Sequence, residues 1–328
     1  MKKRKMLIDG LQYCNWSKEI FEDMNASGIT AVHVTICYHE NFPETIKNII
    51  FWRRCFEKYS DLIIPGDNVS DIIRAHDEGR TAIILGFQNC SAIEDDIGLI
   101  EIFHKLGVRF MQLSYNNQSL LCAGCYEETD AGLTRMGREV IREMNRLGMI
   151  IDMSHSGERS TLQAIQTSER PIAISHANPY EWHPAQRNKS NAVLKELSEA
   201  GGMIGFSIYP HHMHQGSKCT LDDFCGMIAK TVDLMGVDRI GFGSDLCQNQ
   251  PDSIVEWMRV GRWSYDKADF LRQNDQATFP KQPPWFQTNR DFHNILRGLR
   301  DIGFSETEVN KISGENWLNF FRETFNDQ

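Results

Sequence analysis

This chain of 328 residues lacks an excess of positive charge and lacks any long apolar run. Its 35 lysines and arginines are outnumbered by 44 aspartates and glutamates, so the formal net charge is −9. Binding to the phosphate backbone of a nucleic acid requires a basic surface, and this balance argues against it.

No apolar run approaches the ~20 residues of a membrane-spanning helix. The apolar stretch after MKKRK is too short for the core of a signal peptide. We therefore expect a cytoplasmic protein that binds neither nucleic acid nor a membrane.

Paired cysteine motifs are also scarce. The nine cysteines are scattered, and a single CxxC is formed by Cys122 and Cys125. A structural zinc site usually needs a second pair of cysteines or histidines, and the spacing of Cys219 and Cys225 does not provide an obvious one. Reduced thiols are the default in a cytosolic protein, so we interpret Cys122 and Cys125 as two thiols in a loop.

The chain also lacks linkers, low-complexity tracts and short-period repeats. Instead, short apolar runs alternate with amphipathic segments, several of which end in glycine as helices do. The apolar runs are typical of parallel strands buried on both faces. They occupy residues 5–10, 30–37, 81–88, 108–114, 148–154, 171–175, 203–209 and 239–245. Eight strand–helix alternations predict an α/β fold, a (β/α)8 barrel of the TIM type, formed by a single domain over residues 1–328.

Residues from about 248 to 288 interrupt this alternation. The segment contains QPDSIVEWMRVGRW and TFPKQPPWF and follows the last predicted strand. A long loop at this place in a barrel lies at the active-site end, where it can act as a lid or as a dimer contact. After it we expect a last barrel helix over 289–301 and a C-terminal helical extension.

Polar side chains stand at the ends of several predicted strands. His155 and His176 follow two neighbouring strands, and Asp245 ends the last one. Chemistry in barrels gathers at the carboxyl ends of the strands. Neutral imidazoles suit zinc, a bound metal lowers the pKa of its water to about 7, and a nearby carboxylate can move the proton. One such histidine alone is more often a hydrogen-bonded structural residue, but three residues at matching strand ends favour a metal-dependent hydrolase.

Other histidine and aspartate signals are weaker. His211, His212 and His214 in YPHHMH could bind a metal, although a solvated or substrate-facing loop is the favoured interpretation. His33 is interpreted as a satisfied core histidine. Asp152 is interpreted as a residue that packs or orients a neighbour and does not bind a metal.

Several longer motifs carry a family resemblance. They are DAGLTRMGREVIREMNRLGMIIDMSHSGERST, RPIAISHANP, HPAQRNKS, GGMIGFSIY, DRIGFGSDLCQ and the closing GENWLNFF. With them the chain resembles the membrane (renal) dipeptidase family of the amidohydrolase superfamily over nearly its whole length. The resemblance implies a (β/α)8 barrel and a zinc-dependent dipeptidase whose site holds two metal ions.

The residues expected around the first metal ion depart from the family pattern. Relatives carry DGHND after the first strand, whereas this chain has DGLQY, so Leu11 replaces a histidine and Tyr13 an aspartate. The bridging glutamate of the family corresponds to Gln88 in GFQN. A leucine cannot bind a metal, and a glutamine supplies no negative charge. Uncompensated charge of two ions in a partly dry pocket costs several kcal/mol per ion, which argues against two zincs.

The residues expected around the second metal ion are retained. The resemblance assigns His155 and His176 as its ligands, with Gln88, Asp245 or water completing the set. It further implies that Asp245 is the catalytic acid and base and that Arg187 binds the substrate carboxylate. Tyr115 stands where the family has a substrate-contacting histidine. The sequence therefore predicts a divergent member of the family with at most one zinc ion.

We predict from these residues a dipeptidase-like hydrolase of a small carboxylated amide, either a dipeptide or an N-substituted amino acid. Two alternatives stay open. One is an enzyme with a metal-free site that acts on another small amino-acid-like molecule, since a fold does not fix a chemistry. The other is a non-catalytic binding relative. Members of the family are commonly dimers, so the resemblance also predicts a homodimer.

Overall fold

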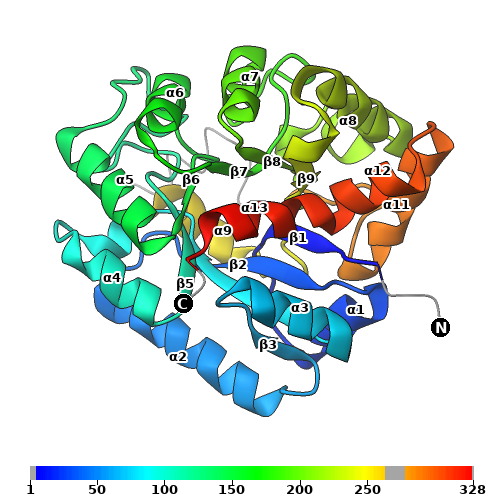
Figure 1. Ribbon diagram of the computed structural model, residues 1–328, viewed down its shortest axis with the longest axis horizontal. Coiled ribbons are helices and arrows are strands. Elements are labelled where there is room, and N and C mark those ends of the chain that lie inside the picture. Colours follow the sequence, from blue (N-terminus) through cyan, green and yellow to red (C-terminus); the bar gives the residue numbers. More distant parts are fainter. Residues whose placement is uncertain (1–4, 263–277, 327–328) are drawn as a thin grey trace.

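The computed structural model describes residues 5–262 and 278–326. Its strands form one parallel sheet, in which β2 also pairs with β4 and so closes eight strands into a barrel (Figure 1). This confirms the predicted fold. The strands follow one another in the sheet as β2 (Ala31–Cys37), β1 (Ile8–Gln12), β9 (Ile240–Phe242), β8 (Met203–Phe206), β7 (Ala173–Ala177), β6 (Ile150–Asp152), β5 (Val108–Gln112), β4 (Thr81–Phe87) and β3 (Ile63–Pro65).

The strand β3 was not predicted from the sequence. It pairs with the first half of β4, from Thr81 to Ile83, while β5 pairs with the second half from Leu85 onward. It therefore lies beside the barrel wall without being one of the eight strands that close it. A three-residue strand that ends in a proline gives too short an apolar run to be recognised.

Helices surround the barrel, as Figure 1 shows. They are α1 (Lys18–Ser27), α2 (Phe42–Lys58), α3 (Val69–Glu78), α4 (Gly98–Lys105), α5 (Arg135–Leu147), α6 (Glu158–Thr167), α7 (Asn191–Glu199), α8 (Leu221–Met235) and α11 (Phe292–Asp301). Short single-turn helices complete the connections at Ser91–Ile93, Pro210–His212, Gly216–Lys218, Val237–Arg239 and Asn289–Asp291.

Capping residues set the ends of these helices. Ser17 accepts a hydrogen bond from the backbone N–H of Ile20, and Gly28 ends α1 in the left-handed region at φ 81°. In α2, Asn41 and Glu44 form a reciprocal capping box, which satisfies backbone donors that the first turn leaves unpaired. Such signals let the sequence predict where most barrel helices begin and end.

The C-terminal helices close the N-terminal end of the barrel. After α12 (Glu306–Asn310) and a π-helical turn (Lys311–Glu315), α13 (Asn316–Thr324) crosses the barrel in front of the strands (Figure 1). Trp317 is fully buried and donates from Nε1 to the carbonyl of Phe242 at 2.9 Å. A side chain at Gly10 would come within 2.7 Å of the Trp317 ring, so glycine allows this close approach. The helical extension therefore forms the floor of the barrel.

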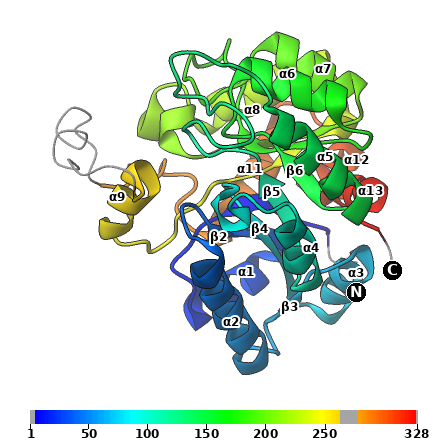
Figure 2. The ribbon, with the colours of Figure 1, turned by 90° about the vertical axis from the view of Figure 1, so that its left-hand side faces the viewer.

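The interruption predicted after the last strand is present at the opposite end. Its described part carries α9 (Ser253–Val260), which lies across the barrel from α13 (Figure 2). Residues 263–277 of the predicted excursion lie outside the described residues. None of the helices in the described part of the chain combines the length and the apolar character that crossing a membrane requires.

Candidate active site at the carboxyl ends of the strands

The predicted site residues come together at one end of the barrel. Gln88 follows β4, His155 follows β6, His176 lies near the end of β7 and Asp245 follows β9. All four residues are buried, at 9% exposure or less. A cavity of about 630 Å³ opens above them. It is lined by Gln88, Tyr115, Asn116, Asn117, Tyr126, Glu127, His155, Gln186, Arg187, Tyr209, His211, His212, Asp245, Met258 and Arg259.

Two polar atoms lie close to His155 Nε2 beneath this cavity. The Nε2 atoms of His155 and His176 lie 3.0 Å apart. The Oε1 atom of Gln88 lies 2.8 Å from His155 Nε2. The amide of Gln88 is held in this orientation because its Nε2 donates to Thr35 Oγ1 at 2.7 Å and to Tyr38 Oη at 2.9 Å. The amide oxygen therefore faces the imidazole pair.

Hydrogen bonds behind His155 determine which of its nitrogens carries the proton. Its Nδ1 lies 2.6 Å from Asn116 Oδ1, an oxygen that can only accept. The neutral imidazole therefore carries its proton on Nδ1 and presents a lone pair at Nε2. That lone pair faces the lone pairs of Gln88 Oε1.

A buried carboxylate keeps the proton of His176 on Nδ1, as in His155. The Nδ1 atom of His176 lies 2.7 Å from Ser175 Oγ, and the Ser175 hydroxyl donates to the carboxylate of Asp152. The hydroxyl of Ser154 also donates to Asp152. Because Ser175 gives its only proton to the carboxylate, it accepts from His176 Nδ1–H, and the Nε2 lone pair is left facing His155. The interpretation of Asp152 as an orienting residue is confirmed.

Neither imidazole is in a place that favours an added proton. Burial lowers the pKa of His155 and of His176 well below the ordinary value, and the nearby Arg187 guanidinium lowers the pKa of both further. The three acceptors thus meet without a hydrogen between them. Such an arrangement calls for a cation or for a donor from a bound molecule.

The three acceptors fit a single metal ion. Zinc lies ~2.0–2.1 Å from nitrogen and oxygen ligands, which places two ligand atoms of a tetrahedral site ~3.3 Å apart. The observed separations of 3.0 and 2.8 Å are close to this value. Among the residues that the structure describes, no group of three His, Cys, Asp or Glu side chains could hold an ion. A metal ion at this place would therefore take the amide oxygen of Gln88 as its third protein ligand.

A second ion does not fit the neighbouring half of the site. Leu11 is fully buried in the apolar core, and Tyr13 packs its ring edge-on against Tyr38 with centroids 4.7 Å apart. The nearest carboxylate on β1 is that of Asp9, which accepts from the backbone N–H of Ser244 at 2.7 Å and from its hydroxyl. Uncharged and already paired groups thus occupy the place where a second ion would need negative ligands.

Asp245 has the environment of an acid–base group. It adopts a left-handed backbone conformation at φ 57°, which aspartate tolerates better than most residues. Its backbone N–H donates to the carbonyl of Leu11 at 3.0 Å, which ties β9 to β1. Burial raises the pKa of Asp245 to about 7, while the positive charge of Arg187 acts in the opposite direction. A pKa near neutrality suits proton transfer in both directions.

Arg187 places a cation at the cavity without a carboxylate partner in the described part of the chain. It is 1% exposed. Its guanidinium donates to the carbonyls of Ser154 and of His176, the latter at 3.0 Å, and its Nε has no acceptor. A buried cation held only by neutral oxygens favours an anionic ligand.

Tyr115 covers one side of the imidazole pair. Its ring stacks on His155 with centroids 4.2 Å apart and meets Tyr38 edge-on at 5.3 Å. Burial raises the pKa of Tyr115 well above its usual value, so the phenol keeps its proton and can donate a hydrogen bond.

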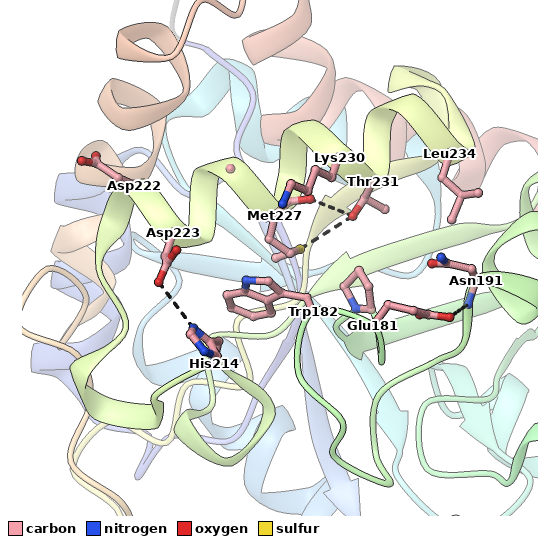
Figure 3. A pocket seen from close by; sticks show the side chains of 12 residues that line it. Glu181, Trp182, Asn191, His214, Asp222, Asp223, Met227, Lys230, Thr231 and Leu234 are labelled. Atoms are coloured by element: carbon pink, nitrogen blue, oxygen red, sulfur yellow. Dashed lines mark hydrogen bonds and ion pairs between the residues drawn. The ribbon is translucent and has the colours of Figure 1, made fainter.

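The histidine-rich segment divides between two places. His211 and His212 line the cavity, and His212 Nδ1 lies 4.0 Å from Asp245 Oδ2. His214 faces a separate surface groove, where it pairs with Asp223 at 3.5 Å beside Trp182 (Figure 3). The segment was interpreted as a solvated or substrate-facing loop, and accordingly two of its histidines line the cavity while His214 is exposed.

Several cavity residues were not predicted from the sequence. Met258 and Arg259 reach the cavity from α9, within the predicted excursion, and Tyr209 and Tyr126 come from loops. Met258 and Arg259 could not be assigned to the site from the sequence, since only the fold brings α9 over the strand ends. The thiols of Cys122 and Cys125 are free, as expected, and Cys125 Sγ lies 3.4 Å from Asn116 Oδ1.

An eight-stranded barrel with paired histidines and a buried aspartate at its strand ends defines the class as the metal-dependent hydrolase type of TIM barrel. Comparison with known proteins gives the family. The profile of the membrane dipeptidase family (peptidase family M19) matches residues 16–259, and the chain belongs to this family.

Curated relatives are longer than this chain. Dipeptidase tcpJ of Claviceps purpurea is 30% identical over 289 residues, which are 87% of this chain and 61% of the relative. An uncharacterized dipeptidase of Schizosaccharomyces pombe is 29% identical over 209 residues, 62% of this chain and 50% of the relative. The chain thus spans half to three fifths of the length of these relatives.

Solved structures share the barrel over its full length. An amidohydrolase from Pseudomonas aeruginosa superposes with a TM-score of 0.90 at 36% identity and covers 98% of this chain and 97% of its own. A metallo peptidase from Rhodobacter sphaeroides, liganded with a phosphinate mimic of the dipeptide L-Ala-D-Ala, gives a TM-score of 0.82 at 17% identity, covering 98% and 100%. The second likeness is one of fold alone.

Proposed function

We propose that this protein hydrolyses the amide bond of a small carboxylated substrate, a dipeptide or an N-substituted amino acid, with at most one zinc ion. The observation that carries the proposal is the close approach of His155 Nε2 to Gln88 Oε1, at 2.8 Å, and to His176 Nε2, at 3.0 Å. Membership in the membrane dipeptidase family supports the reaction class.

The ligands proposed for the ion are His155, His176 and Gln88. When bound there, a divalent ion supplies a water of lowered pKa and polarises the scissile carbonyl. The unpaired Arg187 binds the carboxylate of the substrate and so fixes the position of the amide. The phenol of Tyr115 donates a hydrogen bond to the carbonyl oxygen as that oxygen becomes negative.

Asp245 moves the proton. As a carboxylate it accepts a proton from the attacking water while the water oxygen bonds to the amide carbon. When the carbon–nitrogen bond breaks, Asp245 gives this proton to the leaving nitrogen. The pKa of Asp245, raised by burial to about 7, allows both transfers near neutral pH.

Metal content and turnover test this proposal together. After purification with zinc present, elemental analysis is expected to find about one zinc per chain, and His176→Ala is expected to lose both the zinc and the hydrolysis of dipeptides and N-acyl amino acids. The matched control is His214→Ala, whose side chain faces the outer groove and pairs with Asp223. This control is expected to retain both properties.

The other outcomes distinguish the alternatives. Turnover with no bound zinc would replace the proposal by a metal-free enzyme. Binding of the same compounds without turnover, in protein that holds zinc, would identify a non-catalytic binding relative. Two zincs per chain would refute the single-ion site.

We also infer that residues 1–328 form one domain in a cytoplasmic homodimer. All strands of the described residues belong to one sheet, and the nine free thiols fit a reducing compartment. The dimer follows from the family resemblance alone, and light scattering coupled to gel filtration would measure it directly.

A further inference from the structure

The mouth of the barrel has two halves of different character. The half formed by β6 to β9 carries His155, His176, Arg187 and Asp245. The half formed by β1, β2, β4 and β5 carries Leu11, Tyr13, Tyr38, Gln88 and Tyr115, and none of these side chains is a carboxylate. A substrate whose carboxylate meets Arg187 and whose amide reaches the imidazole pair extends its acyl side toward the second half.

We propose that the preferred substrate is an N-acyl amino acid, with a neutral acyl chain and no ammonium group on the acyl side of the scissile bond. This inference rests on the proposed hydrolytic function and narrows it. In a free dipeptide the α-ammonium is one carbon away from the scissile carbonyl. With the lone pairs of His155, His176 and Gln88 taken up by the proposed ion, this ammonium would lie beside them and the phenol of Tyr115 with no negative partner next to it.

The carboxylates near the site are engaged elsewhere. Asp9 is fully buried and bonded to Ser244 and to the Gln12 amide, the latter at 2.8 Å. Glu40 accepts from the backbone N–H of His39 at 3.0 Å and from Trp257 Nε1 at 3.2 Å, and it does not line the cavity. Neither is placed to receive a substrate ammonium.

Two carboxylates do line the cavity among the described residues. Asp245 serves the leaving nitrogen, which lies on the other side of the scissile carbonyl from an α-ammonium. Glu127 accepts a hydrogen bond from the backbone N–H of Gln118 and also lines two neighbouring surface hollows, so it stands at the rim. At this rim position, Glu127 is the other carboxylate available to pair with a substrate ammonium. The variant Glu127→Gln, described below, tests this pairing.

One part of the cavity wall suits an uncharged chain. Tyr115, Tyr126, Tyr209 and Met258 all line it. Aromatic rings and the thioether of methionine bury apolar groups well and adapt to chains of different shape. A free ammonium would lose its hydration there without gaining an ion pair, and this loss is the basis of the discrimination.

An isosteric pair of substrates gives the test. N-propionyl-alanine and glycyl-alanine differ by a methyl group in place of an ammonium group, and both are assayed with L- and with D-alanine on the zinc-loaded protein. We expect kcat/KM for the propionyl compound to be at least ~10-fold higher, which corresponds to about 1.4 kcal/mol. Equal or faster cleavage of glycyl-alanine would overturn the proposal and leave the hydrolytic function standing.

Binding provides a readout that does not depend on turnover. The ketomethylene analogues of the two compounds cannot be cleaved, and calorimetry on the wild-type protein is expected to show tighter binding of the propionyl analogue. If neither substrate is cleaved, the proposed hydrolytic function fails, while the ratio of the two affinities still decides the inference about the ammonium group.

One variant and a pH profile sharpen the result. Glu127→Gln is expected to leave the selectivity ratio unchanged, and a collapse of glycyl-alanine binding in this variant would show that Glu127 receives the ammonium. For glycyl-alanine alone, kcat/KM is expected to rise as pH passes the amine pKa of about 8.

Discussion

The substitution Asp152→Asn tests whether a buried hydrogen-bond chain sets the metal site. One carboxylate oxygen of Asp152, Oδ1, accepts from Ser154 N at 3.0 Å, from Ser154 Oγ and from Ser175 N at 3.1 Å. The other, Oδ2, accepts from Ser175 Oγ. An asparagine keeps the three bonds to Oδ1 and places its NH2 group where Oδ2 was. The Ser175 hydroxyl must then accept and turn its own proton away.

The new direction of that proton changes the tautomer of His176. The nearest acceptor for it is His176 Nδ1, at 2.7 Å from Ser175 Oγ. An imidazole that accepts at Nδ1 carries its proton on Nε2, the atom proposed as a ligand, and a protonated nitrogen cannot bind a metal. Changes in groups that orient a ligand weaken metal binding ~10- to 100-fold, or about 1.4 to 2.7 kcal/mol.

The zinc affinity of Asp152→Asn tests the role of this hydrogen-bond chain. Competition with a chelator is expected to show the ~10- to 100-fold loss in Asp152→Asn. Loss of a charge-assisted hydrogen bond is also expected to lower the free energy of unfolding by ~1.5–3 kcal/mol, measured by chemical denaturation. In a Ser175→Ala background the relay is absent, so adding Asp152→Asn should change zinc affinity little. Wild-type affinity in Asp152→Asn would refute the reasoning.

Three further predictions concern other parts of the molecule. The kcat/KM value is expected to rise as pH increases through about 7, the raised pKa of Asp245, because only the carboxylate accepts a proton, and Asp245→Asn should remove activity. Since this folded-state pKa lies above the ordinary value of 3.8, the folded protein loses stability relative to the unfolded chain as pH rises between the two values. Asp245→Asn, which carries no charge, should therefore be more stable than wild type above this window, as measured by chemical denaturation. The triple variant Leu11→His, Tyr13→Asp and Gln88→Glu should bind about two zinc ions per chain instead of about one, as measured by elemental analysis. An unchanged zinc content would show that these three positions do not prevent binding of a second ion. Trp317→Ala should lower the free energy of unfolding by ~3–5 kcal/mol while Trp317→Phe lowers it less, because the ring fills the floor of the barrel.

The fold was predictable because its signals are local. Each barrel strand lies in a short, mostly apolar run of the sequence, and glycines such as Gly28 mark helix ends. The strand β3 escaped prediction because Ile63–Pro65 carries only three residues and pairs with one half of one neighbour. Its existence depends on the space that β5 leaves beside β4.

The site was predictable only in part, for a physical reason. Strand-end positions indicated His155, His176 and Asp245 because parallel strands deliver their last residues to one face. The proton of Ser175 and the amide orientation of Gln88 were not predictable, since they depend on which side chains meet across β2, β4, β6 and β7. The contribution of Arg259 required knowing that α9 lies over the barrel.

Position 11 illustrates how the site tolerates change. The side chain there is a leucine buried in the core, yet its carbonyl receives the backbone N–H of Asp245 and holds the turn in which that residue has a positive φ. Every amino acid carries the same carbonyl. The backbone anchor of Asp245 is therefore independent of which residue occupies position 11, so the side chain at position 11 can change without displacing Asp245. A metal ligand depends on the side chain at its position, whereas the placement of Asp245 depends on a backbone carbonyl. Metal binding and the placement of Asp245 can therefore change independently during evolution.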